Sequence, residues 1–127
     1  MFPIGRIVGT GCVRGLSYEA RAAYDAPFPT ERHKAGARVF PALVPTRPDD
    51  PASAANRRAW EALREWKKPF LTLFGKNAPI TRGAEKRLQS RILGAGGQPH
   101  AVLRGAGHFL QEDVGPELAE RLVAWMR

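Results

Sequence analysis

The sequence has a single cysteine, Cys12, among its 127 residues, so no disulfide can form within the chain. A lone thiol fits a reducing compartment, and we expect a cytoplasmic protein. There is no cluster of cysteine, histidine and acidic residues at metal-ligand spacing, which argues against a metal site. No apolar run approaches the length of a membrane span, and residues 1–6 lack the apolar core of a signal peptide. The sequence therefore predicts a small protein without metal or membrane contacts.

Acidic residues are scarce relative to basic ones: 12 against 20, for a formal net charge of +8. Such a balance can indicate a nucleic-acid partner. The basic residues are scattered, however, and Arg57 and Arg58 share their segment with Glu61 and Glu65. No block of like charge and no basic stretch interleaved with aromatic residues is present. We therefore expect an arginine-rich surface and no nucleic acid. A basic nucleic-acid binder stays an alternative, which a salt titration of duplex binding would test.

The first half of the sequence predicts helices and loops but no strand. Residues 1–16 contain four glycines and are expected to be irregular. Ser17 can cap a short helix that ends near residue 25. Residues 31–40 allow a helical turn or two, cut by Gly36 and closed before Pro41. Residues 44–51 are expected to be a loop, in which Asp49 and Asp50 are interpreted as turn and capping residues and not as a catalytic carboxylate pair.

A clear amphipathic helix is predicted over residues 53–67, with Trp60, Leu63 and Trp66 on its apolar face. We interpret these aromatic residues as packing residues and not as a ligand cage. Hydrophobic residues make up 43% and charged residues 25% of the sequence, which is typical of a globular domain.

Residues 69–126 predict the order strand, helix, strand, helix. The strands are expected over 70–75 and 100–104, and the helices over 83–93 and from near Pro116, where Leu118, Leu122 and Trp125 would form a buried stripe. This order is typical of a parallel β-α-β unit with a right-handed crossover. Two parallel strands leave edges with unpaired backbone groups, and parallel sheets are normally larger and covered on both faces. The chain therefore looks like the later part of a larger α/β domain.

A histidine follows the second predicted strand. Gly105 and Gly107 allow the backbone to turn sharply, and His108 comes just past the carboxyl end of the strand. In open α/β sheets, binding and catalytic sites are built at that edge. These residues alone leave two interpretations open: a catalytic histidine, or one that only hydrogen-bonds across a loop.

Two stretches resemble the haloalkane dehalogenases of the α/β-hydrolase superfamily. Residues 16–29 with 34–41 resemble the later helices of that family's cap domain, and residues 105–113 resemble its catalytic-histidine motif. The resemblance implies an α/β fold, namely the C-terminal portion of an α/β-hydrolase. Residues 1–68 would be a remnant of the helical cap domain and its return helix. Residues 69–127 would be the C-terminal β-α-β-α part of the core.

The resemblance implies a hydrolase that cleaves carbon–halogen bonds of a small halogenated organic substrate, without a cofactor. In the family, a carboxylate displaces halide and forms an alkyl ester, and a histidine held by an acidic residue activates water to hydrolyse it. Matched residue by residue, this implies roles for one base, four pocket positions and one lost acid. They are His108 as general base; Phe40, Pro41, Val44 and Ile80 as substrate-binding positions; and Ala78 at the position of the family's acid.

The sequence departs from the family in two ways. The nucleophile, the oxyanion-hole loop and the halide-binding tryptophan belong upstream of the matched part. None of the tryptophans in this sequence matches the halide-binding one. Alanine at 78 cannot orient an imidazole, and Asn77 could accept a hydrogen bond only if the register slips by one. Glu112 and Asp113 follow the histidine in ordinary members and are interpreted as helix-start residues. Some relatives place the acid after an earlier strand, so an upstream acid stays open.

We therefore expect the chain to be inactive alone, with a missing N-terminal half as its partner. The loss of the acid at Ala78 leaves a second interpretation open, a degenerate hydrolase fold that acts as a non-catalytic interaction module.

Overall fold

A computed structural model describes residues 2–127. The α-helices are α1 (Ile4–Thr10), α2 (Tyr18–Asp25), α3 (Ala35–Val39), α4 (Ser53–Arg64), α5 (Ala84–Arg91) and α6 (Leu110–Met126). Short 3₁₀ helices are η1 (Glu31–Lys34), η2 (Phe40–Leu43) and η3 (Leu93–Ala95), and the strands are β1 (Leu73–Gly75) and β2 (Ala101–Leu103). In the described part of the chain, no helix is both long enough and apolar enough to cross a membrane.

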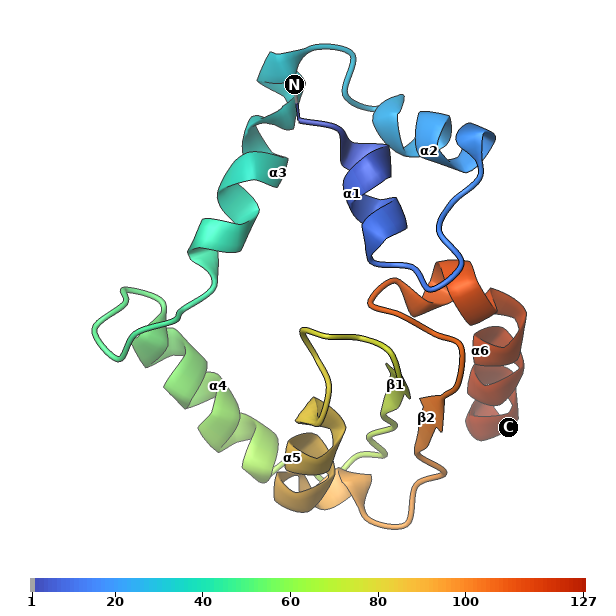
Figure 1. The fold of residues 1–127 in the computed structure, drawn as a ribbon. Helices are drawn as coiled ribbons and strands as arrows, with labels where there is room; N and C mark the ends of the chain where they lie inside the picture. Colours follow the sequence, from blue (N-terminus) through green and yellow to red (C-terminus); the bar gives the residue numbers. More distant parts are fainter. Residues whose placement is uncertain (1) are drawn as a thin grey trace.

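The two strands form the predicted parallel pair. Leu73 lies opposite Ala101 and Gly75 opposite Leu103, and α5 lies on the crossover between the strands. Figure 1 shows α3 and α4 along one side of the molecule, with α6 on the other side, next to the sheet. The Arg87 guanidinium lies 4.6 Å from the Trp60 ring centroid, so α5 contacts α4 near the amino ends of the strands. The expected order of strand, helix, strand, helix is confirmed, with strands shorter than predicted.

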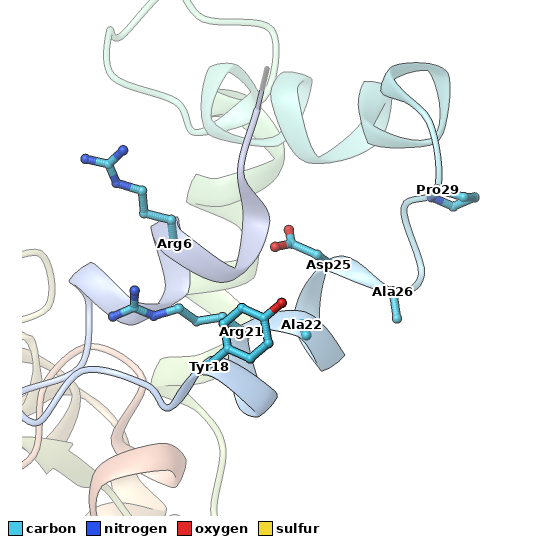
Figure 2. Close-up of a pocket in the computed structure, with 7 residues that line it drawn as sticks. All are labelled: Arg6, Tyr18, Arg21, Ala22, Asp25, Ala26 and Pro29. Atoms are coloured by element: carbon cyan, nitrogen blue, oxygen red, sulfur yellow. The ribbon is translucent and has the colours of Figure 1, made fainter.

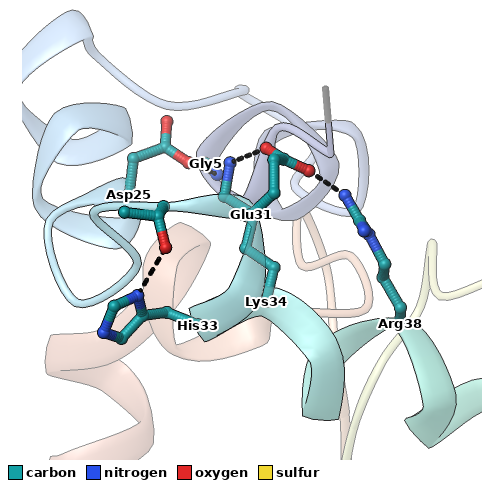
Figure 3. Close-up of polar contacts among 7 residues, drawn as sticks. Gly5, Asp25, Glu31, His33, Lys34 and Arg38 are labelled. Atoms are coloured by element: carbon teal, nitrogen blue, oxygen red, sulfur yellow. Dashed lines mark hydrogen bonds and ion pairs between the residues drawn. The ribbon is translucent and has the colours of Figure 1, made fainter.

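The prediction that residues 1–16 are irregular is wrong, because α1 forms there; Met1 lies outside the described residues. Glycines disfavour an isolated helix, each by about 1 kcal/mol relative to alanine. Here Gly5 is needed for packing, since a Cβ on it would lie 2.3 Å from the Arg21 carbonyl oxygen of α2. The Asp25 carboxylate accepts the Gly5 N–H at 3.0 Å and so caps α1 from α2 (Figure 3). Tertiary contact with α2 therefore overrides the local preference.

Residues 31–43 are more continuously helical than the sequence predicts. Gly36 does not cut the segment but lies inside α3, and Pro41 lies in the first turn of η2. Glu31 forms ion pairs with Lys34, at 2.9 Å, and with Arg38 (Figure 3). The pair with Lys34 lies within η1, and the pair with Arg38 spans Gly36.

Two other local predictions near α2 and α4 are confirmed. The Ser17 hydroxyl accepts the Ala20 N–H at 3.1 Å and caps α2. The Asp50 carboxylate accepts the Ala52 N–H at 2.9 Å, so it is a turn residue, as expected.

Helix α4 ends at Arg64, earlier than the predicted residue 67.

Helix α6 consists of two helical pieces. A short turn begins at Leu110, and Val114, with the non-helical angles φ −138° and ψ 34°, separates it from the main part of the helix. Pro116 lies in the first turn of that main part, as predicted, where a missing backbone N–H leaves no helical hydrogen bond unmade. The expected buried stripe is incomplete, because Leu122 is 37% exposed and Trp125 is only half-buried.

A polar network ties the start of β1 to the start of β2. The His100 Nδ1 accepts the Thr72 N–H at 3.1 Å, and its Nε2 donates to the Ala95 carbonyl at 2.8 Å. Gln89 of α5 donates to the Thr72 hydroxyl at 2.8 Å, and Thr72 is only 3% exposed. His100 is therefore a structural residue with both ring nitrogens in use.

The chain exposes far more surface than a self-contained domain of its size. Its accessible surface is 9279 Å², whereas a compact monomer of its 14.0 kDa mass exposes about 6,700 Å². No large side chain in residues 2–127 is completely buried. Alanines make up half of the buried hydrophobic residues in this part of the chain, which are Val8, Ala78, Ile92, Ala95, Leu103 and Ala106. The core is therefore too thin for a chain of this length.

We expect the isolated chain to melt without a sharp cooperative transition and to bind an apolar dye. The reason is the open sheet and the exposed apolar side chains of β2 and α6, among them Val102 and Val123. Calorimetry and dye fluorescence on the purified chain would test this. A monomer with one sharp calorimetric transition and no dye binding would contradict it.

Candidate functional site

His108 lies where the sequence predicts, in the loop between β2 and α6. Gly105 has φ +71°, a left-handed conformation that favours glycine, and it turns the chain after β2. The His108 backbone N–H donates to the Gly11 carbonyl at 2.7 Å, and its ring meets the Phe109 ring edge-on at 5.0 Å. The ring Nδ1 is buried and has no hydrogen-bond partner within residues 2–127. The side chain is therefore held by packing, with one polar atom left unpaired.

The turn after β1 lies directly against the histidine loop. The Lys76 N–H donates to the Leu103 carbonyl, and the Asn77 N–H to the Ala106 carbonyl, both at 2.9 Å. A Cβ on Gly75 would lie 2.3 Å from the Gly107 carbonyl oxygen, so only glycine allows this approach. The two turns thus meet at the carboxyl edge of the sheet, as parallel strands require.

Ala78 is the next residue of this turn and is 2% exposed. Its backbone N–H donates to the Gly75 carbonyl at 3.2 Å, which folds the turn back toward the strand. A methyl group offers no acceptor. The residue at which the sequence analysis places the lost acid is therefore buried and apolar, in the turn that contacts the loop of His108. A buried polar atom without a hydrogen bond typically lowers the stability of the folded state by about 1–3 kcal/mol. The unpaired Nδ1 of His108 is therefore a position at which a hydrogen-bond partner would be favourable.

Asp113 connects the histidine loop to the N-terminal segment. Its carboxylate accepts backbone N–H groups of Gly107 at 2.8 Å, Val13 at 2.9 Å and Arg14 at 3.1 Å. Burial opposes ionisation of this carboxyl, but the three hydrogen bonds and the charge of Arg14 outweigh it and lower its pKa. Asp113 is therefore ionised over a wide pH range and fixes the residue next to His108.

Sequence reasoning treats Asp113 as an ordinary helix-start residue and misses this role. It does lie in the first turn of α6, as predicted. Two of its partners, however, are about 100 positions away in the sequence, and nothing near Asp113 indicates them. A single sequence offers no local signal for such a contact.

The N-terminal segment also packs tightly on the loop. A Cβ on Gly107 would lie 2.3 Å from the Gly11 carbonyl oxygen. The neighbouring Cys12 thiol lies 3.3 Å from the Val8 carbonyl. Burial, together with the negative charges of Asp113 and Glu112, raises the pKa of this thiol. Cys12 is therefore held in the thiol form and does not offer a ready nucleophile beside the histidine.

The four substrate-binding positions implied by the resemblance are exposed. Phe40 is 71% and Ile80 78% exposed, Val44 is 54% exposed, and Pro41 is exposed beside Phe40 on η2. Phe40 and Pro41 come from one segment and Ile80 from the turn that follows Ala78. Their role in a pocket stays a prediction.

An open cavity of about 610 Å³ lies elsewhere, over α1 and α2, and contains none of the predicted site residues. Figure 2 shows Arg6 and Arg21 extending toward the same side of it. Tyr18, which also lines it, is 83% exposed, so this is a surface feature and not an enclosed site.

We expect Asp113→Asn to loosen the contact between residues 11–14 and the histidine loop at neutral pH. The pKa of Asp113 is lowered by folding, so its ionised form contributes stability above the ordinary carboxyl pKa. That contribution is lost as the pH falls through the lowered value. Hydrogen exchange of the Val13 and Gly107 amides should therefore be faster in the variant near neutral pH, and the difference should vanish once acid protonates the wild type.

Glu112→Gln is the matched control for this change. Glu112 precedes Asp113 but is exposed and accepts only the Tyr24 hydroxyl at 2.7 Å among the contacts of the described chain. Its replacement should leave exchange at Val13 and Gly107 unchanged. Equal effects of the two substitutions would show that Asp113 has no special role.

The chain is similar in sequence to several known proteins. No family model matches the chain. The chain is 57% identical over all its 127 residues to a haloalkane dehalogenase of Mycolicibacterium paratuberculosis, of which it covers 42%. It is 54% identical over 127 residues to haloalkane dehalogenase 1 of Mycobacterium tuberculosis, again over 42% of that protein. A haloalkane dehalogenase of Psychrobacter cryohalolentis is 48% identical over 125 residues, 98% of this chain and 41% of the relative.

The chain thus spans about two fifths of the length of the curated relatives it matches. The match covers their C-terminal part, and with the parallel strands and helices it implies the corresponding part of an α/β-hydrolase fold. The chain is a homologue of the C-terminal part of the haloalkane dehalogenases.

Proposed function

We propose that this chain supplies the histidine and the end of the cap to a hydrolase that cleaves carbon–halogen bonds of small haloalkanes. The observation that carries the proposal is the placement of His108 at the carboxyl edge of the parallel strands, in a chain 57% identical to a haloalkane dehalogenase. In this role, His108 is the general base. It removes a proton from the water that attacks the alkyl ester, so that the carboxylate of the protein is regenerated and the alcohol is released.

The same proposal assigns the chain two regions. Residues 1–68 would be the end of a helical cap with its return helix, and residues 69–127 the last part of the core. The distribution of the elements supports this division. Residues 2–68 form helices and loops without a strand, and both strands lie after residue 69. The hydrogen bonds from Val13 and Arg14 to Asp113 join the two regions beside His108. Phe40, Pro41, Val44 and Ile80 would then face the substrate from the two regions.

The chemistry requires a carboxylate nucleophile that we place in the part of the relatives lying outside the match. Without it no ester forms, and His108 has nothing to hydrolyse. The chain alone should therefore release no halide. Ala78 and the unpaired Nδ1 of His108 indicate in addition that the histidine lacks its usual acidic partner from this side of the site.

The test is a joined protein, in which the N-terminal part of the Mycolicibacterium paratuberculosis relative is fused ahead of this chain. We expect at least one halide ion per molecule from a short bromoalkane, and none above the buffer rate from the chain alone. A joined protein that is folded but releases no halide would contradict the proposal. It would favour the alternative of a degenerate hydrolase fold that acts as a non-catalytic interaction module.

A further inference from the structure

The first turn of α6 carries two neighbouring carboxylates that contact different parts of the N-terminal segment. The Asp113 carboxylate accepts the backbone N–H groups of Val13 and Arg14, a few residues before α2 begins. The Glu112 carboxylate accepts the Tyr24 hydroxyl at 2.7 Å, and Tyr24 is the last residue but one of α2. The chain is therefore attached to the start of α6 both before α2 and at its end.

The Tyr24 hydroxyl reaches α6 beside a space that packing does not fill. An open cavity of about 510 Å³ is lined by residues of both helices. Helix α2 lines it with Ala20, Ala23 and Tyr24, and the residue of α6 that lines it is Glu112. Alanine side chains are too short to fill such a space, so the contact between the end of α2 and α6 depends on the Tyr24 hydroxyl.

The charge state of this pair favours the contact. The hydrogen bond to the Glu112 carboxylate, together with burial and the negative charge of Glu112, raises the pKa of the Tyr24 phenol. The hydroxyl therefore keeps its proton at neutral pH and remains a donor. Hydrogen bonds from a hydroxyl to a charged acceptor are shorter and stronger than those between neutral groups, which fits the 2.7 Å between the two oxygens.

The turn that receives these contacts is continuous with the histidine loop. The Glu112 N–H donates to the Phe109 carbonyl at 3.0 Å, so one tight turn connects Glu112 to the residue that follows His108. The Asp113 carboxylate accepts the N–H of Gly107, the residue that precedes His108, at 2.8 Å. A displacement of this turn therefore moves the residues on both sides of His108.

We propose that Tyr24, through its hydrogen bond to Glu112, positions the loop of His108 for hydrolysis of the alkyl ester. The inference rests on the proposed function, in which His108 is the general base. Tyr24 is a positioning residue, because it acts through the turn. A base must lie within hydrogen-bonding reach of the water it activates, and a misplacement of about 1 Å can slow such a step by about 10²-fold. The same hydrogen bond would couple the placement of the proposed cap region to that of the base.

The test is Tyr24→Phe in the joined protein, a change that removes only the hydroxyl. The net contribution of one hydrogen bond corresponds to about two- to tenfold in an equilibrium constant. We expect the ester to persist longer by a factor in that range, while the first halide release, which needs no base, keeps its rate. Rapid quench and intact mass measure the two steps. An unchanged ester lifetime with a lowered melting temperature, or equal slowing of both steps, would show a purely structural role and overturn the proposal.

Substitutions of Glu112 test whether the hydroxyl acts through this residue. Glu112→Ala removes the acceptor and should lengthen the ester lifetime as Tyr24→Phe does. The double variant should be no slower than either single variant, because both changes break the same contact. Glu112→Gln keeps an acceptor oxygen and should lie closer to the unmodified protein. Additive effects in the double variant, or equal effects of alanine and glutamine, would overturn the proposal.

Tyr18→Phe is the matched control on the same helix. Tyr18 is 83% exposed and lines the separate cavity over α1 and α2 (Figure 2). Its replacement should leave both steps unchanged, and an effect equal to that of Tyr24→Phe would overturn the proposal. An unmodified joined protein that releases no halide would instead contradict the proposed function, so the two failures give different results.

Hydrogen exchange on the same proteins gives a measurement that does not depend on catalysis. The amides of Gly107 and His108 should exchange faster in Tyr24→Phe than in the unmodified protein, and no faster in Tyr18→Phe. Exchange that is unchanged by Tyr24→Phe would show that the hydroxyl does not hold the loop, and it would overturn the proposal.

Discussion

His108→Ala in the joined protein is expected to leave the first halide release intact and to trap the ester that it produces. Displacement of halide by a carboxylate needs no base, whereas hydrolysis of the ester needs water to be deprotonated. Loss of a general base slows such a step by about 10²–10⁴-fold. We therefore expect the ester to persist longer by that factor, with one halide ion released per molecule.

Rapid quench for halide and intact mass for the alkylated protein would measure both steps. His33→Ala is the matched control, because His33 is exposed and its Nδ1 contacts only the Thr30 hydroxyl, at 2.8 Å, within residues 2–127. It should leave the ester lifetime unchanged. An ester that decays equally fast with and without His108 would show that another group activates the water.

The later half of the fold could be predicted because its signals are local. Apolar runs bounded by glycine and proline mark β1 and β2, and Gly105 and Gly107 mark the turn that presents His108. The order of these elements then fixes a parallel crossover. Ser17 shows the same principle, since a helix cap acts within four residues.

What the sequence could not provide are contacts between distant segments. Helix α1 forms because Gly5 packs on α2 and is capped by Asp25, and neither contact can be inferred from the local composition. The role of Asp113 depends on Val13, at the other end of the chain. The burial of α6 is overestimated from the sequence for a related reason. An apolar stripe predicts a covered face, but no other segment of residues 2–127 covers Leu122 fully.

Ala78→Asp in the joined protein is expected to have the largest effect of all, if no other acid serves the histidine. Loss of the acid from a comparable catalytic triad costs about 10⁴-fold in rate, or about 5 kcal/mol of barrier. Restoring a carboxylate in the turn that contacts the histidine loop should give the unpaired Nδ1 of His108 an acceptor and stabilise the imidazolium formed during hydrolysis. The ester should then stop accumulating, and steady turnover should rise toward that factor.

Ala78→Asn separates charge from shape, because the amide can accept a hydrogen bond from the imidazole but cannot stabilise its positive charge. Ala78 is 2% exposed, so a carboxylate placed there is desolvated and stays ionised only if it finds a partner. We therefore expect rescue with aspartate and little with asparagine, measured as ester lifetime by intact mass and as halide turnover. Steady turnover without a burst, unchanged by either substitution, would mean that an acid from the N-terminal part already holds His108. Ala78 would then be an ordinary packing residue of the turn.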